Sequence, residues 1–151
     1  MKRTIGILLV AGAAVGAYKW HASSTAPAHG VSAADRVWID HLPQNGKEKV
    51  QAFVMVSEAS MGVFDRSSQW EGAYQLFRFE QNGQDIRAMF PQSGKGERWI
   101  AETTECAKNG FDYCLHLTGA SQGVQNYYSK KGWEVRGGDA DAAVRAILPK
   151  D

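Results

Sequence analysis

The two cysteines of this 151-residue chain, Cys106 and Cys114, are the residues whose spacing most directly suggests chemistry. They could form a disulfide, supply ligands to a metal site together with His116, or be unrelated thiols. Structural zinc needs four ligands, usually including a C-x-x-C pair, and three candidates without that pair do not meet the requirement. In an exported protein, two cysteines at this spacing predict a disulfide. We expect no metal or other cofactor.

Segments 98–106 and 111–119 predict a hairpin, and the length of its loop decides whether the cysteines meet. A two-residue turn at Asn109-Gly110 would place Cys106 opposite Tyr113, and the cysteines would then point to opposite faces. A loop of three or five residues centred on Gly110 would place Cys106 opposite Cys114. We therefore expect the longer loop.

The same register aligns polar side chains on one face of this hairpin. Thr104 would lie opposite His116, and Glu102 opposite Thr118. Glu102, Thr104 and His116 could then form a polar site, with His116 and Glu102 as acid and base. The alternative, which we favour, is a solvated face of the sheet.

No catalytic residues are expected elsewhere. The adjacent pair Asp40-His41 could join a serine in a Ser-His-Asp grouping, but no G-x-S-x-G elbow is present to expose a nucleophile. Adjacent residues of a strand point to opposite faces, so Asp40 is not expected to orient His41. We therefore interpret the chain as a non-enzyme.

Aromatic side chains are numerous enough to line a ligand pocket, because such pockets are mostly apolar. The candidates are Trp38, Trp70, Phe77, Trp99 and Trp133. The alternative is that they belong to an ordinary hydrophobic core.

Short apolar segments separated by turn residues fill the body of the chain. We predict strands over 36–42, 49–58, 73–81, 84–91, 98–106, 111–119 and 126–135, a short strand within 61–72, and a Lys-Gly break in the last strand. Such spacing predicts a mainly β fold, an antiparallel meander forming a small barrel or sandwich. A short C-terminal helix over 137–149 would follow, with Asp139 as its N-cap.

The hairpin over 73–91 is the strongest local prediction. Asn82-Gly83 is a favoured pair for a two-residue type I′ turn. This turn would set two apolar pairs, Phe77–Ala88 and Phe79–Ile86, and two like-charged pairs, Arg78–Arg87 and Glu80–Asp85. Diagonal pairs of opposite charge would offset the repulsion.

The first 17 residues combine two basic residues with an apolar run from Ile5 to Ala17, which is the order of an export signal. The alternative is an uncleaved membrane anchor over 4–20, near the short limit for a spanning helix. Either arrangement places the rest of the chain outside the cytoplasm, in the periplasm or another extracytoplasmic space. We expect a flexible linker over 18–34, the β domain over 35–136, and the helix and tail over 137–151.

Nucleic acid is not an expected partner. The formal net charge is +1, and beyond the N-terminal segment no basic run is longer than Lys130-Lys131. Nucleic-acid binding needs a concentrated cationic surface.

Residues 115–133, "LHLTGASQGVQNYYSKKGW", join an apolar strand, a glycine-containing loop and a tyrosine-rich final strand. With the preceding hairpins, this stretch resembles the later half of small lipocalin-like (calycin) barrels. The resemblance implies a barrel and a small apolar ligand. Our first expectation for function is a non-catalytic binding or assembly component of a bacterial-type cell envelope, with an envelope protein as partner. The alternative is a carrier of a small hydrophobic ligand.

Overall fold

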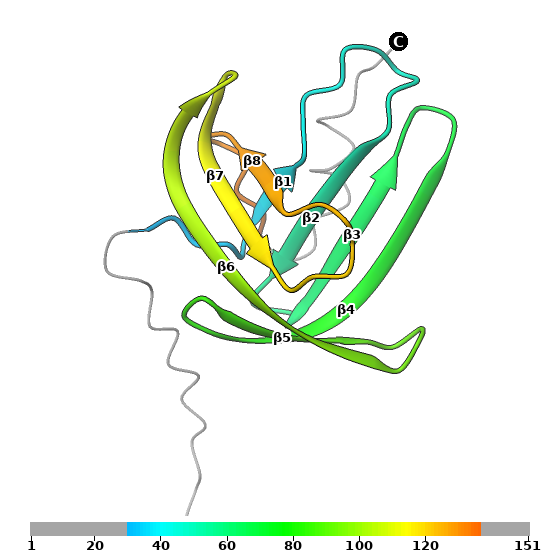
Figure 1. Ribbon diagram of the computed structural model, residues 1–151, viewed down its shortest axis with the longest axis vertical. Helices are drawn as coiled ribbons and strands as arrows, with labels where there is room; N and C mark the ends of the chain where they lie inside the picture. The colour runs from blue at the N-terminus through cyan, green and yellow to red at the C-terminus, as the bar shows by residue number, and fades with distance from the viewer. Residues whose placement is uncertain (1–29, 137–151) are drawn as a thin grey trace, which may run out of the picture.

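The computed structural model describes residues 30–136, which form a closed barrel of antiparallel strands (Figure 1). The strands are β1 (Arg36–Ile39), β2 (Val50–Val56), β3 (Met61–Ser67), β4 (Gly72–Asn82), β5 (Asp85–Phe90), β6 (Lys95–Lys108), β7 (Phe111–Thr118) and β8 (Asn126–Ser129). Each strand pairs with the next, and β8 returns to β1. The predicted meander is therefore confirmed, as a barrel.

Several predicted segments lie outside the described residues: the export signal or anchor over 1–17, most of the linker, and the helix over 137–149. Within residues 30–136 there is no helix, and hence none that is long and apolar enough to cross a membrane.

Alternation along the strands directs large aromatic side chains into the barrel. Phe77 lies at the centre of this group, with its ring centroid 5.0 to 6.3 Å from those of Phe53, Phe64, Phe79, Phe90 and Trp99. The backbone of β3 approaches closely at Gly62, where a Cβ would lie 2.2 Å from Phe77 Cζ. The interior is thus filled by rings that touch one another, with glycine providing space for Phe77.

A second apolar cluster covers the outer face of β1 and β2. Its members are Val37, Ile39, Val50, Ala52, Val54, Val56, Phe111 and Val135, packed with partly buried Val63, Tyr128 and Trp133. Strand β2 is therefore buried on both faces, as expected for a strand that is apolar on both.

Both ends of the barrel are closed by chain segments. At one end Ala33 and Ala34 are buried, and Ala33 accepts a 2.8 Å hydrogen bond from Trp38 Nε1. Residues 33 and 34 thus belong to the packed barrel. At the other end the β7–β8 loop packs Ala120 and Val124 against the core. Glu97 holds this loop, because its carboxylate accepts hydrogen bonds from Trp99 Nε1 and from the Ser121 amide and hydroxyl.

The chain after β8 makes a second contact with β1. Gly132 takes a positive φ of 84°, and the backbone then pairs again, with Val37 N donating to Trp133 O (2.9 Å) and Val135 N to Asp35 O (3.0 Å). The predicted Lys-Gly break in the last strand is confirmed. The nearly buried Arg36 reinforces this seam, because its guanidinium bonds Lys130 O and Glu134 and lies 4.3 Å from the Tyr113 ring centroid.

The register of the β4–β5 hairpin differs from the prediction. Asn82 pairs with Asp85, so the turn residues are Gly83 and Gln84, and Gly83 has a φ of 62°. Positive φ at the first of two turn residues suits glycine. The new register keeps the apolar face but places Glu80 opposite Arg87. The like-charged pairs of the predicted register are thereby avoided.

The β6–β7 hairpin contains the Cys106–Cys114 disulfide, with a Cα–Cα distance of 5.7 Å. The expected longer loop is wrong: Lys108 pairs with Phe111 across a two-residue turn, Asn109-Gly110. The two-residue turn permits the disulfide because β6 has an irregularity between Glu105 and Lys108. Between the pairs Glu105–Tyr113 and Lys108–Phe111, β6 has one residue more than β7. This extra residue places the Cys106 side chain on the same face of the hairpin as Cys114, so the two sulfur atoms can bond.

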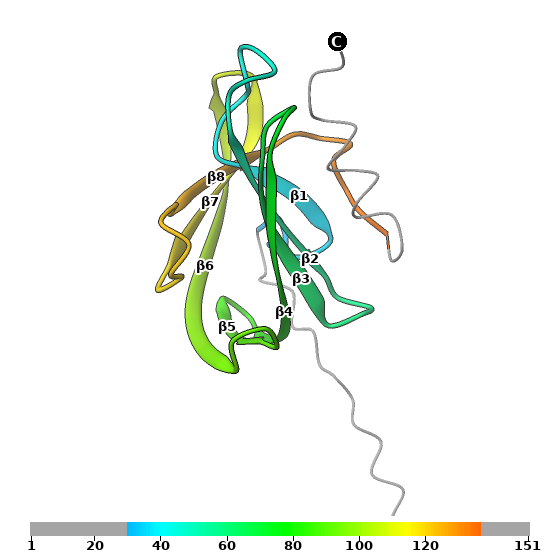
Figure 2. The same cartoon turned by 90° about the vertical axis from the view of Figure 1, so that its right-hand side faces the viewer.

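Figure 2 shows the β3–β4 hairpin and the β6–β7 hairpin on opposite sides of the barrel, with β5 crossing between them at the base. Strand β5 is short, so β4 pairs with it only over Arg78 to Asn82. The first half of β4 therefore extends beyond its neighbour.

Candidate binding surface

The five residues predicted to line a ligand pocket do not lie together. Trp38, Phe77 and Trp99 are fully buried in the barrel interior, where all three belong to the core cluster. Trp70 lies in the β3–β4 turn and is 72% exposed. Trp133 packs on Phe111 in the outer cluster, with ring centroids 6.2 Å apart.

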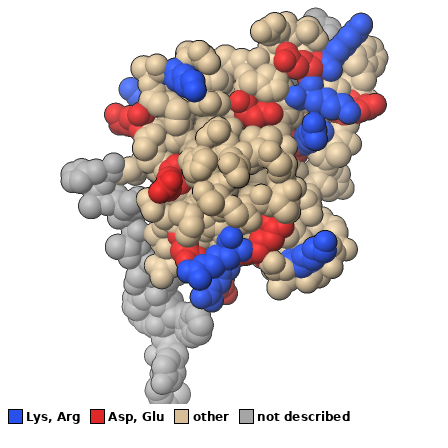
Figure 3. Space-filling view, viewed as in Figure 1, with Lys and Arg blue, Asp and Glu red and all other residues tan. Residues whose placement is uncertain are grey.

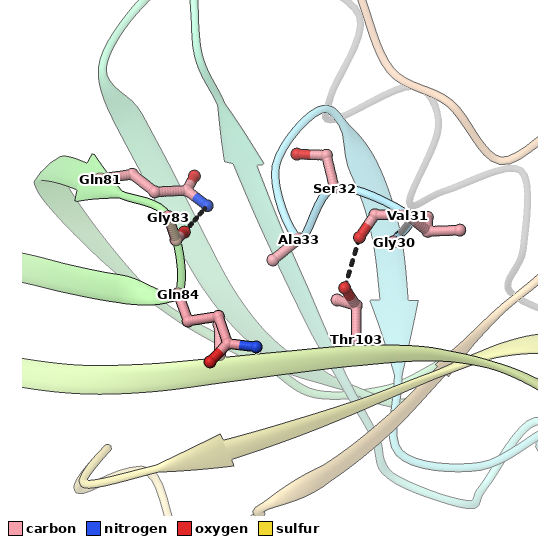
Figure 4. Close-up of a pocket in the computed structure, with 9 residues that line it drawn as sticks. Gly30, Val31, Ser32, Ala33, Gln81, Gly83, Gln84 and Thr103 are labelled. Carbon is pink, nitrogen blue, oxygen red and sulfur yellow. Dashed lines mark hydrogen bonds between the residues drawn. The ribbon is translucent and has the colours of Figure 1, made fainter. Parts of the chain in front are cut away.

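A cavity of about 210 Å³ lies at the barrel end closed by residues 30–33 (Figure 4). Its other walls are the tip of the β4–β5 hairpin, at Gln81 and Gln84, and β6 at Ala101 and Thr103. Figure 4 shows Thr103 directed at the Val31 carbonyl, to which it donates a hydrogen bond. The walls carry no ionisable side chain, and their polar side-chain groups are the hydroxyls of Ser32 and Thr103 and the two glutamine amides.

A second cavity, of about 320 Å³, lies beside Asp40, His41, Glu48 and Tyr128. His41 Nδ1 is 2.9 Å from Asp40 Oδ1, so the expectation that Asp40 does not orient His41 is wrong. Strand β1 ends at Ile39, and alternation of side chains no longer applies beyond it. The Asp40 carboxylate also accepts a 3.0 Å hydrogen bond from Gln51 N, which fixes its position.

A second carboxylate, that of Glu48, lies beside His41 at this cavity. His41 Nε2 is 3.2 Å from Glu48 Oε1, yet that buried nitrogen makes no hydrogen bond. The histidine thus lies between the carboxylates of Asp40 and Glu48. Within residues 30–136 no three His, Cys, Asp or Glu side chains are placed to bind a metal ion.

The polar residues predicted on the β6–β7 hairpin share an outer face in a different register. Glu102 pairs with His116 and Thr104 with Cys114, whereas Thr104–His116 and Glu102–Thr118 pairs were expected. His116 Nδ1 lies 2.9 Å from Asn126 Oδ1, on the β8 side. Neither Glu102 nor Thr104 lines either of the two cavities described above.

The outer face of β3, β4 and β5 presents large apolar side chains to solvent. Met61 pairs with Arg78, and Arg78 pairs with Met89, so the three lie in one row across the sheet. Met61 is 38% exposed and Met89 50% exposed. Val63 and Leu76 form the next row and are partly buried. We call Met61, Val63, Leu76, Arg78 and Met89 the methionine patch.

Neighbouring residues leave this patch uncovered. Met89 pairs with Gly96 of β6, which has no side chain to lie over it. Exposed apolar side chains that gather on one face indicate an interaction site, whereas single ones do not. Sequence reasoning missed the patch, although alternation in 61–63, 74–78 and 85–90 could have located it once the strands were paired.

The fold defines a class, the closed eight-stranded antiparallel β-barrel with a disulfide-linked hairpin. The chain matches no protein-family model, and comparisons with curated proteins and with solved structures give no match.

Proposed function

We propose that this chain is an exported, non-catalytic binding domain of a bacterial-type cell envelope, and that it contacts a partner protein through the methionine patch. The observation that carries the proposal is the contrast between the two faces of the barrel wall. The interior is filled by aromatic rings, while Met61 and Met89 project outward to solvent. Methionine is favoured at surfaces that adapt to a partner, because its side chain is flexible and polarisable.

Export is supported by the disulfide. Cys106 and Cys114 are bonded, and disulfides persist in oxidising compartments such as the periplasm. Figure 3 shows one face on which Lys and Arg side chains lie near Asp and Glu, with no continuous cationic area. This face therefore gives no support to a nucleic-acid partner.

The alternative function, carriage of a small hydrophobic ligand, draws on the barrel itself, which is compatible with a lipocalin-like fold. The packed rings around Phe77 argue against it, since carriers of this kind hold their ligand inside the barrel. Native mass spectrometry of the isolated chain separates the two functions. We expect the mass of the polypeptide alone, and a retained small molecule would favour the carrier.

The partner surface is tested by site-specific photocrosslinking in the cells that produce the protein. A benzophenone side chain at Met89 should give a discrete adduct with another protein. The same probe at Thr118, exposed on β7 away from the patch, should give none. Adding Met61→Lys to the variant with the probe at Met89 should reduce the yield of the crosslinked adduct at least several-fold. The lysine would place a charge in the row of side chains that contains Met89. An adduct of equal yield with Met61→Lys, or at both probe positions, would contradict the proposal.

A further inference from the structure

The first half of β4 has one backbone edge without a strand partner in residues 30–136. Gly72 to Arg78 pair with β3, whereas pairing with β5 begins only at Arg78. Phe79 N bonds Ser60 O on the β3 side, so the even-numbered residues of β4 direct their N–H and C=O groups to the other side. The backbone groups of Gly72 and Tyr74 thus point outward along an open edge.

A side chain occupies the next position of this edge. With its amide oriented to satisfy both groups, Gln92 donates to Leu76 O at 2.9 Å and accepts from Leu76 N at 3.2 Å. These are the two bonds that a neighbouring strand would make with Leu76. The edge is therefore covered at Leu76 and open at Gly72 and Tyr74.

The open stretch carries none of the usual protection against pairing. Gly72, Ala73 and Tyr74 are all exposed, and none is charged or proline. Natural monomers usually place lysine, proline or a bulge at such an edge. Tyr74, at 71% exposure, and Trp70, at 72%, are the most exposed large apolar side chains of the described residues.

We propose that this edge pairs with the same edge of a second copy of the chain, antiparallel and about a two-fold axis at Ala73. In this register Gly72 of each copy lies opposite Tyr74 of the other. The pair exchanges N–H···O=C bonds on both sides of the axis, and Leu76 keeps its bonds to Gln92. Each Tyr74 ring lies over a glycine, an arrangement in which an aromatic covers the exposed backbone of an edge glycine.

The second copy is favoured over an unrelated strand because the edge is complementary to itself. A two-fold interface needs a patch that fits its own copy, and the Gly72–Tyr74 exchange meets that condition. The axis brings Ala73 opposite Ala73, so no like charges face one another across it. The contact is small, which predicts a weak, concentration-dependent dimer.

Sedimentation velocity on the purified full chain, from micromolar to near-millimolar concentration, tests the proposal. We expect the parent to shift towards a dimer as concentration rises. Tyr74→Pro removes the N–H that would bond the second copy and that bonds nothing within the described barrel. Tyr74→Lys places a charge at the edge, which disfavours pairing with the second copy. Both variants should therefore remain monomeric. Met89→Lys is the matched control and should dimerise like the parent, because its backbone is paired on both sides.

Cysteine crosslinking tests the register. Ala73→Cys should form an interchain disulfide on mild oxidation, because residues directly opposite in a non-hydrogen-bonded pair bring their Cβ atoms close. Gln75→Cys, on the same strand, should not. A parent that stays monomeric throughout, or equal crosslinking at both positions, would overturn the proposal. Neither result bears on the photocrosslink at Met89, so the proposed function is judged separately.

Discussion

At the scale of single residues, Tyr127 shows how burial shapes an ionisable group. Its ring is fully buried in the core, and its hydroxyl lies 2.9 Å from Gln51 Nε2, which donates to it. Burial raises the pKa of Tyr127 well above its usual value of 10.0, although the bond from Gln51 acts in the opposite direction. The folded protein thus holds the phenolic proton more tightly than the unfolded chain does.

This difference predicts a loss of stability at high pH. Below about pH 10 Tyr127 is protonated in both states and contributes no pH dependence. Above that value the unfolded chain loses the proton first, so the free energy of unfolding should fall as pH rises. Tyr127→Phe should show a shallower fall in urea denaturation between neutral pH and pH values above 10. Tyr128→Phe, on the outer face, is the control, and an equal slope for parent and Tyr127→Phe would contradict the assignment.

At the scale of elements, the sequence predicts which segments pair but not always in which register. The strands and the presence of a hairpin over 73–91 follow from alternation and turn residues, and the structure confirms both. The turn itself begins one residue later, at Gly83, and this register places Glu80 opposite Arg87. Glycine suits a turn in either register, so the local sequence alone does not choose between them. Likewise, the extra residue of β6 near Cys106 leaves no mark on local composition. Regular strands joined by a two-residue turn would keep the cysteines on opposite faces, so the sequence alone predicts a longer loop.

The Cys106–Cys114 disulfide should stabilise this hairpin by restricting the unfolded chain. We expect Cys106→Ser to lower the free energy of unfolding by about 2–3 kcal/mol under non-reducing conditions, with Cys114→Ser having the same effect. In the presence of reductant the parent and both variants should melt together. Thermal melting followed by circular dichroism is the measurement. Equal melting without reductant would show that the bond contributes nothing to stability.

At the scale of the whole molecule, the decisive property is that the barrel is filled. Composition could not reveal this, because the same tryptophans and phenylalanines suit a core and a ligand cavity. Pairing of distant strands decides it, by bringing Phe53, Phe77 and Trp99 into one cluster and leaving Trp70 outside. The functional surface is likewise a product of pairing, since Met61 and Met89 come from strands that β4 separates.

A cavity-creating substitution tests the filled interior. Phe77→Ala should cost about 3–5 kcal/mol of stability and leave an apolar void. Such voids stay dry and accept benzene, so benzene should raise the melting temperature of this variant and leave that of the parent unchanged. Phe77→Leu provides a milder variant with a smaller loss. Benzene that stabilises the parent to the same extent would show that space already exists among the rings.

The seam at β1 has a consequence for how the chain is made. Strand β1 pairs with β2 on one side and with β8 and residues 133–135 on the other. The barrel therefore closes only when the first described strand pairs with nearly the last described residues. A nascent chain emerging from the ribosome or a translocation pore cannot complete the fold until that stretch is free. We expect ribosome-bound intermediates arrested before residue 133 to stay sensitive to protease, because the barrel closes only once residues 133–135 can pair with β1.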